Sequence, residues 1–109
     1  MAAKKNTRRN RGEDALDYFD RTSGPLTLGR LVRSIRLGEA ETLAVFAKLL
    51  GVSKAHLSDV EHDRRVVSAQ RAAAWARQLG YHEGQFVQLA LQDELNAAGI
   101  KLKVEVRAA

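Results

Sequence analysis

Residues 43–62 carry the pattern of two short helices that cross at a tight turn, and this pattern limits the fold more than any other feature of the chain. Apolar side chains stand where both helices must contact a core, and the small residue Ala47 stands where the helices approach most closely. We expect Gly51 to end the first helix with a positive φ. The full set is Leu43, Phe46, Ala47, Leu50, Gly51, Val52, Leu57 and Val60. Eight such constraints within twenty residues predict a helix-turn-helix unit.

Helical periodicity extends to both sides of this unit and predicts an all-α domain of five helices. The expected helices span residues 28–36, 43–50, 54–62, 68–79 and 83–98. Residues that can cap or open a first turn stand at Thr27, Thr42, Ser53 and Ser68, and glycines that can end a helix stand at Gly38, Gly51, Gly80 and Gly99. The outer helices contribute the expected core residues Leu28, Leu31, Val32, Ile35, Ala72, Ala73, Trp75, Ala76, Leu79, Phe86, Leu89, Ala90 and Leu95.

After residue 99 the period changes from helical to two. Apolar residues alternate with charged ones, which is the pattern of a half-buried strand. The apolar set is Ile100, Leu102, Val104 and Val106, and the charged set is Lys101, Lys103, Glu105 and Arg107. A lone strand needs a partner, so this segment is expected to be either a dimer element or a flap on its own domain. The expected fold is therefore five helices followed by a short C-terminal β-strand.

The length of 109 residues supports one domain, with a core small enough that dimerisation would add to its stability. We expect a flexible basic N-terminal tail over residues 1–24, a folded domain over residues 25–98 and a C-terminal strand over residues 99–109. The formal net charge of +5 favours polyanionic partners. Five of the 18 basic residues precede the first acidic one, which leaves 13 to balance 13 acidic residues. The five are Lys4, Lys5, Arg8, Arg9 and Arg11.

Several classes of function are excluded by the residues present. The chain has no cysteine, so it has neither a disulfide framework nor a cysteine-based metal site. His56, Ser58 and Asp59 lie within four residues of one expected helix, where they cannot form a catalytic relay. His56 and His62 point to different faces, so we expect no metal and no cofactor. The chain has no apolar run that could serve as a leader or a membrane span, so it is expected to be cytoplasmic. Because no catalytic constellation is present, it is also not expected to be an enzyme.

The order of five helices, with the second and third forming the helix-turn-helix, resembles the phage repressor and Cro family, also called the XRE family. The resemblance covers residues 26–98 and is most specific from Phe46 to Glu61. It implies a transcriptional regulator, acting mainly as a repressor, that inserts its third helix into the major groove of double-stranded DNA. We also expect a homodimer on a two-fold symmetric operator.

Four positions show how this chain follows or departs from that family. The family commonly pairs an arginine late in the first helix with a glutamate that ends the third, and Arg36 and Glu61 occupy these places. We expect them to form a structural ion pair. Leu43 replaces a usual glutamine, so a side-chain hydrogen bond to DNA is lost, although its backbone N–H can still meet a phosphate. Asp63 replaces a frequent glycine; aspartate tolerates the left-handed backbone but repels phosphate.

The geometry of the motif assigns the expected DNA contacts. The N-terminal turn of the third helix enters the groove, so Lys54 is the expected reader of guanine O6 and N7, and Ala55 of a thymine methyl group. His56 is expected to bond to a base edge or a phosphate. Loop arginines add affinity through phosphates without reading sequence. The complete set of expected contacts is Thr42, Ser53, Lys54, Ala55, His56, Ser58, Asp59, Arg64 and Arg65.

Each of these assignments has a plainer alternative. Lys54 and His56 could be solvated helix residues, and the loop arginines a solvated charged loop. Asp59 either accepts a hydrogen bond from cytosine N4 or holds Lys54 or Arg64 in place. Glu61 and Arg65, four residues apart, could form a weak surface pair. Trp75 is expected in the core rather than in a ligand platform, and the basic tail either follows the DNA or keeps the chain soluble.

An alternative function shares the DNA binding and adds a protein partner. An antitoxin of a toxin–antitoxin pair would bind and silence a toxin while repressing its own operon. Its toxin-binding element would be residues 13–24 or the strand from Ile100 to Val106. The first of these segments holds the acidic residues Glu13, Asp14, Asp17 and Asp20, a composition that an acidic linker also shows.

Overall fold

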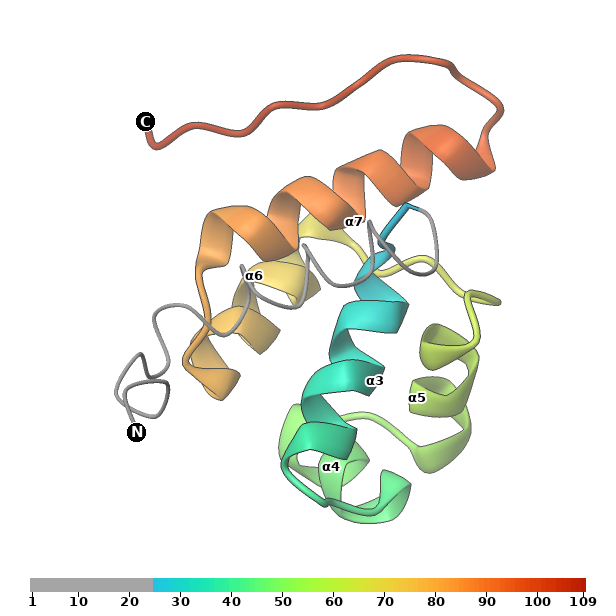
Figure 1. The fold of residues 1–109 in the computed structure, drawn as a ribbon, viewed down its shortest axis with the longest axis vertical. Coiled ribbons are helices and arrows are strands. Elements are labelled where there is room, and N and C mark those ends of the chain that lie inside the picture. The colour runs from blue at the N-terminus through green and yellow to red at the C-terminus, as the bar shows by residue number, and fades with distance from the viewer. Residues whose placement is uncertain (1–24) are drawn as a thin grey trace.

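The computed structural model describes residues 25–109, and this part of the chain forms five α-helices and no β-strand (Figure 1). The helices are α3 (Leu28–Gly38), α4 (Leu43–Leu50), α5 (Lys54–Glu61), α6 (Ala69–Leu79) and α7 (Glu83–Ala97). The predicted all-α class and the order of the helices are confirmed, with ends that differ by no more than two residues. The predicted tail of residues 1–24 lies outside the described residues. None of these five helices is both long and apolar enough to span a membrane.

Local side chains and glycines set most of the helix ends, as the sequence predicts. The side-chain oxygens of Thr27, Thr42, Ser53 and Ser68 each accept the backbone N–H three residues later, at 3.0 to 3.1 Å. Gly51, Gly80 and Gly99 have φ values of 76°, 77° and 74°. Two other residues, Ala40 and Asp63, also have positive φ values, 56° and 58°, and Asp63 therefore adopts the left-handed backbone expected of it.

The five helices pack around one core. α6 packs along α7, α3 contacts both α5 and α7, and α4 contacts α5 and α6. Phe46 and Leu57, from the two helices of the predicted unit, are fully buried, and so is Phe86 from α7. Of the predicted core, five residues are half-buried rather than buried: Leu43, Val52, Ala73, Leu89 and Leu95. The core thereby holds α4 and α5 against the other three helices.

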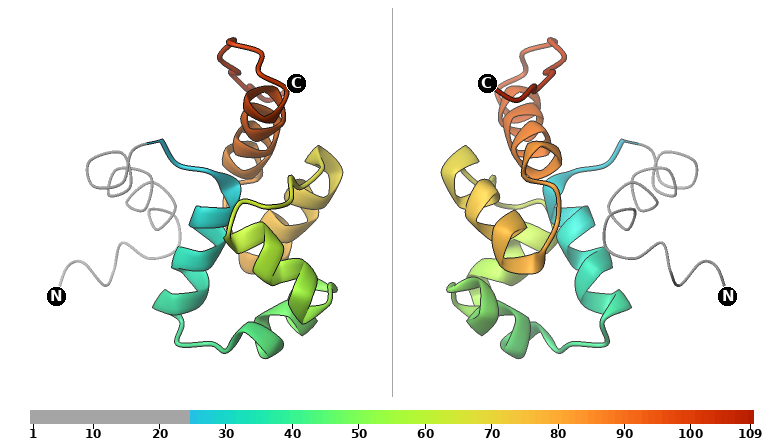
Figure 2. Two further views of the ribbon diagram at one scale, coloured as in Figure 1. Left: turned by 90° about the vertical axis from the view of Figure 1, so that its right-hand side faces the viewer. Right: turned by 90° about the vertical axis from the view of Figure 1, so that its left-hand side faces the viewer.

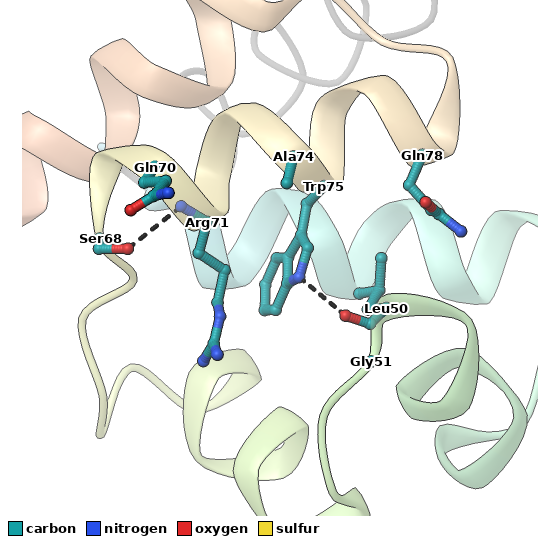
Figure 3. Close-up of a pocket in the computed structure, with 8 residues that line it drawn as sticks. All are labelled: Leu50, Gly51, Ser68, Gln70, Arg71, Ala74, Trp75 and Gln78. Atoms are coloured by element: carbon teal, nitrogen blue, oxygen red, sulfur yellow. Dashed lines mark hydrogen bonds between the residues drawn. The ribbon is translucent and has the colours of Figure 1, made fainter.

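The indole N–H of Trp75 links α6 to the end of α4 by a hydrogen bond. Its buried indole N–H donates to the Leu50 carbonyl oxygen at 3.2 Å. One helical turn further along α6, Gln78 donates to the Leu49 carbonyl oxygen, also at 3.2 Å. These carbonyls have no partner within α4, because a helix leaves its last four carbonyls unbonded. Trp75 is therefore a core residue, as predicted, and it also fixes the turn that leads into α5 (Figure 3).

The predicted C-terminal strand is wrong for the single chain. Residues 100–109 form no β-ladder, and they run back along the outer side of α7 (Figures 1 and 2). The physical reason is that no other extended segment lies beside them within residues 25–109 to complete a ladder. The side-chain amides of Gln88 and Gln92 bond the segment's backbone instead. Of the two expected uses of this segment, the single chain therefore shows the flap.

Candidate nucleic-acid interface

The first turn of α5 is exposed, whereas the rest of this helix packs against the core. Leu57 and Val60 are buried in the core, whereas Lys54 and Ala55 are exposed at the N-terminal end. This contrast arises from the sequence, because the apolar residues recur at helical spacing and the first turn lacks them. A helix seated in this way presents its N-terminal turn to a ligand and keeps its orientation.

Two of the predicted contact residues are helix caps. Thr42 Oγ1 accepts from the Val45 N–H at 3.1 Å, and Ser53 Oγ accepts from the His56 N–H at 3.0 Å. Both residues are exposed, and each hydroxyl retains its proton for donation to a phosphate or base oxygen. The structure thus places the N-termini of α4 and α5 at the surface, each with a hydroxyl beside it.

Arg36 and Glu61 form a bidentate ion pair between the end of α3 and the end of α5. Arg36 Nε lies 2.8 Å from Glu61 Oε2, and a second guanidinium nitrogen lies 2.9 Å from Oε1. The hydrogen bond to Glu61, which is buried with 4% exposure, raises the pKa of Arg36. Arg36 also donates to the Glu41 carbonyl oxygen at 3.0 Å. The pair implied by the family resemblance is therefore present, and it fixes the angle between α3 and α5.

Asp59 holds the loop arginines beside α5. Its Oδ1 atom lies 3.0 Å from Arg64 Nε, and its Oδ2 atom lies 3.8 Å from a guanidinium nitrogen of Arg65. In the single chain Asp59 thus holds Arg64 rather than Lys54, and its contact with cytosine N4 stays a prediction. The alternative surface pair of Glu61 with Arg65 is wrong, because Glu61 is buried against Arg36.

His56 meets an arginine that sequence reasoning missed. Arg71, in the first turn of α6, places a guanidinium nitrogen 3.2 Å from His56 Nε2. Because arginine can only donate, Nε2 accepts, and a neutral His56 carries its proton on Nδ1. Burial lowers the pKa of His56, the positive charges of Arg65 and Arg71 lower it further, and Asp59 acts in the opposite direction. These effects together favour the neutral form of the imidazole.

Arg71 is placed by the same capping that the sequence predicts for α6. Ser68 Oγ accepts the Arg71 N–H at 3.1 Å, and the Arg71 side chain points from α6 toward α5 (Figure 3). Within residues 25–109, Arg71 has no carboxylate partner, so its charge is not neutralised there. The cap in the sequence predicts that Arg71 lies in a first turn, but it gives no indication that this turn adjoins α5.

The side chains around α5 thus form a basic surface with one carboxylate, which we call the α5 surface. It consists of Lys54, His56, Asp59, Arg64, Arg65 and Arg71. Ser58 is half-buried on the same helix. No group of His, Cys, Asp and Glu residues within residues 25–109 has the geometry to hold a metal ion. The predicted acidic cluster of residues 13–20 lies outside the described residues.

Comparison with known proteins identifies the class of this domain. Residues 42–86 match the family model described as "Helix-turn-helix". This segment is a helix-turn-helix domain of the phage repressor/Cro, or XRE, type, the type that DNA-binding transcription regulators carry. Neither the curated proteins nor the solved structures gave a significant match. The match begins at the cap of α4 and ends in α7, so it contains the whole α5 surface together with α4 and α6, while α3 lies outside it.

Proposed function

We propose that this protein represses transcription by binding a specific DNA sequence, with the first turn of α5 in the major groove. The observation that carries the proposal is the α5 surface itself. An exposed helix N-terminus presents Lys54 and Ala55, and the positive charges of Arg65 and Arg71 act on His56 in the same turn. Arg64 lies beside Asp59, nearer the other end of the helix. A helix of this kind fits the major groove, and the flanking arginines fit the phosphates on either side.

Base reading and phosphate binding then belong to different residues. Lys54 donates to guanine O6 or N7, and Ala55 contacts a thymine methyl group. His56 offers its Nδ1–H, since Nε2 is occupied by Arg71. Thr42, Arg64 and Arg65 bond to phosphates, and Asp59 keeps the two loop arginines in position for this. Ser53 lies nearest the bases with Lys54, and Ser58 lies one turn further along α5.

A homodimer is the form in which such a domain would act as a repressor. Two copies related by a two-fold axis would place their α5 helices in successive major grooves, about 34 Å apart. The operator would then contain two half-sites whose centres lie about 10 to 10.5 base pairs apart. A footprint with a single unrepeated half-site would contradict this arrangement.

The proposal is tested by selecting a duplex from a random DNA library with the wild-type protein. Fluorescence anisotropy then compares this duplex with a shuffled one at two salt concentrations. We expect Lys54→Ala to weaken binding to the selected duplex by about 1 to 3 kcal/mol and to change binding to the shuffled duplex little. Arg77→Ala is the control, because it removes one positive charge at an exposed residue that pairs with Glu83 and is not part of the α5 surface. Failure to enrich any sequence would overturn the proposal.

The antitoxin alternative makes the same prediction for DNA. Its specific part is a toxin partner, and its proposed acidic element, residues 13–24, lies outside the described residues. No contact among residues 25–109 favours a toxin over other partners, so we place the repressor first. A toxin reading frame beside the gene, whose product co-purifies with this chain, would reverse that order.

A further inference from the structure

His56 of α5 and Arg71 of α6 meet side chain to side chain, and their contact requires an unprotonated imidazole nitrogen. A guanidinium nitrogen of Arg71 lies 3.2 Å from His56 Nε2. Because arginine only donates, Nε2 accepts and carries no proton. Within residues 25–109 the guanidinium makes no other hydrogen bond and no ion pair. A neutral nitrogen is therefore the only partner of this positive charge in the described part of the chain.

The groups that face His56 leave an excess of positive charge around it. Arg71 faces it from α6, Arg65 from the loop after α5, and Asp59 from the next turn of α5 itself. Burial lowers the pKa of the imidazole most, the two arginines lower it further, and Asp59 opposes them. The Asp59 carboxylate is shared with Arg64, whose Nε lies 3.0 Å away. Three arginines and one carboxylate therefore stand near an imidazole that resists protonation, and an anion would offset their excess charge.

Arg71 also has open space beside it. Its side chain is exposed, and it lines a cleft of about 340 Å³ between α6 and the turn from α4 to α5 (Figure 3). Ser68 and Gln70 line the same cleft, so a hydroxyl group and an amide lie near Arg71. Among the described residues, no carboxylate lines this cleft, so an anion meets no negative charge there. The guanidinium uses one N–H group on His56 and keeps the others for a second acceptor.

We propose that His56 and Arg71 form a binding site for one phosphate of the DNA backbone, and that His56 takes up a proton from the solvent when the phosphate binds. One phosphate oxygen accepts from the Arg71 guanidinium, and a second accepts from the newly protonated Nε2 of His56. The guanidinium turns from Nε2 to the phosphate, because two donors cannot bond to each other. Hydrogen bonds between charged groups are also stronger than the bond of Arg71 to a neutral imidazole.

A phosphate fits this site better than a base edge does. A guanidinium and an imidazolium repel each other unless an anion lies between them, and base edges carry no net charge. His56 lies in the first turn of α5 with Lys54, and phosphates flank the groove that this turn would enter. The added proton leaves the Nδ1–H of His56 in place for the contact proposed above. The inference rests on the proposed function, and it adds a proton to the binding reaction.

The site makes the affinity for DNA depend on pH. In the free protein, burial and the two arginines hold the pKa of His56 below its ordinary value of 6.5. The bound phosphate raises this pKa, because it favours the charged imidazole. Between the two pKa values the complex holds one more proton per chain than the free protein, so the affinity falls as the pH rises. The expected slope is up to about tenfold per pH unit for each proton taken up.

The protonation state of His56 provides the sharpest test. Nuclear magnetic resonance of the full chain with nitrogen-15-labelled histidine reports on each ring nitrogen, and His56→Gln assigns the His56 signals. At pH 6.5 the free protein is expected to show His56 Nε2 mostly without a proton. Adding a shuffled duplex is expected to protonate it, because every duplex carries phosphates whatever its sequence.

DNA affinity provides an independent test of the same site. Fluorescence anisotropy at one ionic strength is expected to show tighter binding of the wild-type protein at pH 6 than at pH 8. His56→Gln is expected to remove this dependence on pH, and circular dichroism checks that it keeps the wild-type helix content. His82→Gln is the matched control, because His82 stands at the start of α7, outside the α5 surface, and makes no capping bond with its side chain. It is expected to keep the dependence on pH.

Either of two results would overturn the inference: a His56 Nε2 that stays unprotonated in the DNA complex at pH 6.5, or a dependence on pH that His56→Gln leaves unchanged. Inorganic phosphate that protonates His56 where DNA does not would overturn it as well, by assigning the site to a small phosphate ligand. The proposed function fails differently. It fails if no sequence is enriched, or if Lys54→Ala binds the selected duplex as the wild-type protein does.

Discussion

Gly29 of α3 lies so close to Val60 of α5 that a Cβ atom at Gly29 would stand 1.9 Å from the Val60 carbonyl oxygen. A side-chain tip can move away from such a contact, but a carbonyl oxygen in the last turn of a helix moves only with the helix. The missing side chain at Gly29 therefore sets the distance at which α3 supports α5. The same contact makes α5 sensitive to a single methyl group.

Gly29→Ala is accordingly expected to lower the free energy of unfolding by about 3 kcal/mol, at the upper end of the range for overpacking a core. Urea denaturation followed by circular dichroism measures this change. Gly38→Ala is the matched control in the same helix, because nothing lies within 4 Å of the added Cβ there. That variant is expected to be neutral or slightly stabilising. Equal stabilities for the two variants would show that α5 adjusts freely to α3.

Removing one partner of the Arg36–Glu61 pair is expected to lower the free energy of unfolding more than replacing both partners with apolar residues. Arg36→Ala leaves the buried carboxylate of Glu61 without its partner, and we expect a loss of about 3 kcal/mol of unfolding free energy. Replacing both residues, as Arg36→Met with Glu61→Leu, removes the buried charge as well and is expected to cost less than Arg36→Ala alone. Urea denaturation of the single and double variants provides the comparison. A double variant that is less stable than Arg36→Ala would contradict this account.

The parts of the fold that depend on neighbouring residues could be predicted from the sequence. The helix caps, the left-handed glycines and the buried stripes all act over a few residues, so their patterns are visible in the chain. The place of α5 in the fold followed as well, because Phe46, Gly51 and Leu57 fix the crossing of α4 and α5. The Arg36–Glu61 pair, 25 residues apart, was reached through the resemblance to a family.

The contacts that could not be predicted join residues that are far apart in the sequence and become neighbours only in the folded chain. Arg71 meets His56 across 15 residues, and Asp93 meets Leu28 across 65. The strand prediction was wrong because alternating apolar and charged residues indicate only an extended segment with two different faces. They do not indicate which groups bond to its backbone N–H and C=O groups. Here the side chains of Gln88 and Gln92 satisfy one edge, and polar residues on a helix carry no local sign of that role.

The contact between Arg71 and His56 predicts a measurable change in the titration of His56. Arg71→Ala removes one of the positive charges that lower the pKa of His56, so this pKa is expected to rise toward its ordinary value. Burial and Arg65 remain, so the recovery is partial. A pH titration of the imidazole resonances by nuclear magnetic resonance gives the value. Arg77→Ala is the control on the same helix, since Arg77 pairs with Glu83 instead.

The same variant is expected to weaken binding to the selected duplex by about fivefold, near 1 kcal/mol, because His56 loses its fixed orientation and the surface loses one cation. Arg77→Ala is expected to change binding less. A variant at Arg71 that leaves both the titration of His56 and the affinity unchanged would remove Arg71 from the α5 surface.

Asp93 makes the stability of the fold depend on pH. Its carboxylate accepts the Leu28 N–H at 3.0 Å, at the start of α3. Burial raises the pKa of Asp93 to about 6, opposed by the bond from Leu28 and assisted by the negative charge of Asp63. The ordinary value is 3.8. Between these two values the folded state binds more protons than the unfolded state, so the stability of the fold falls as the pH rises.

This cost begins near pH 4 and is complete above about pH 6, and solvent screening of the half-buried carboxylate keeps it small. Asp93→Asn retains an oxygen that can accept from Leu28 and carries no charge, so it is expected to be more stable than wild type at pH 7 and similar to it at pH 4. Urea denaturation at these two pH values measures both differences. Glu94→Gln, at the neighbouring exposed carboxylate, is the control and is expected to show no such change. If Asp93→Asn were less stable than wild type at pH 7, the charged carboxylate would stabilise the fold at the start of α3 instead of destabilising it.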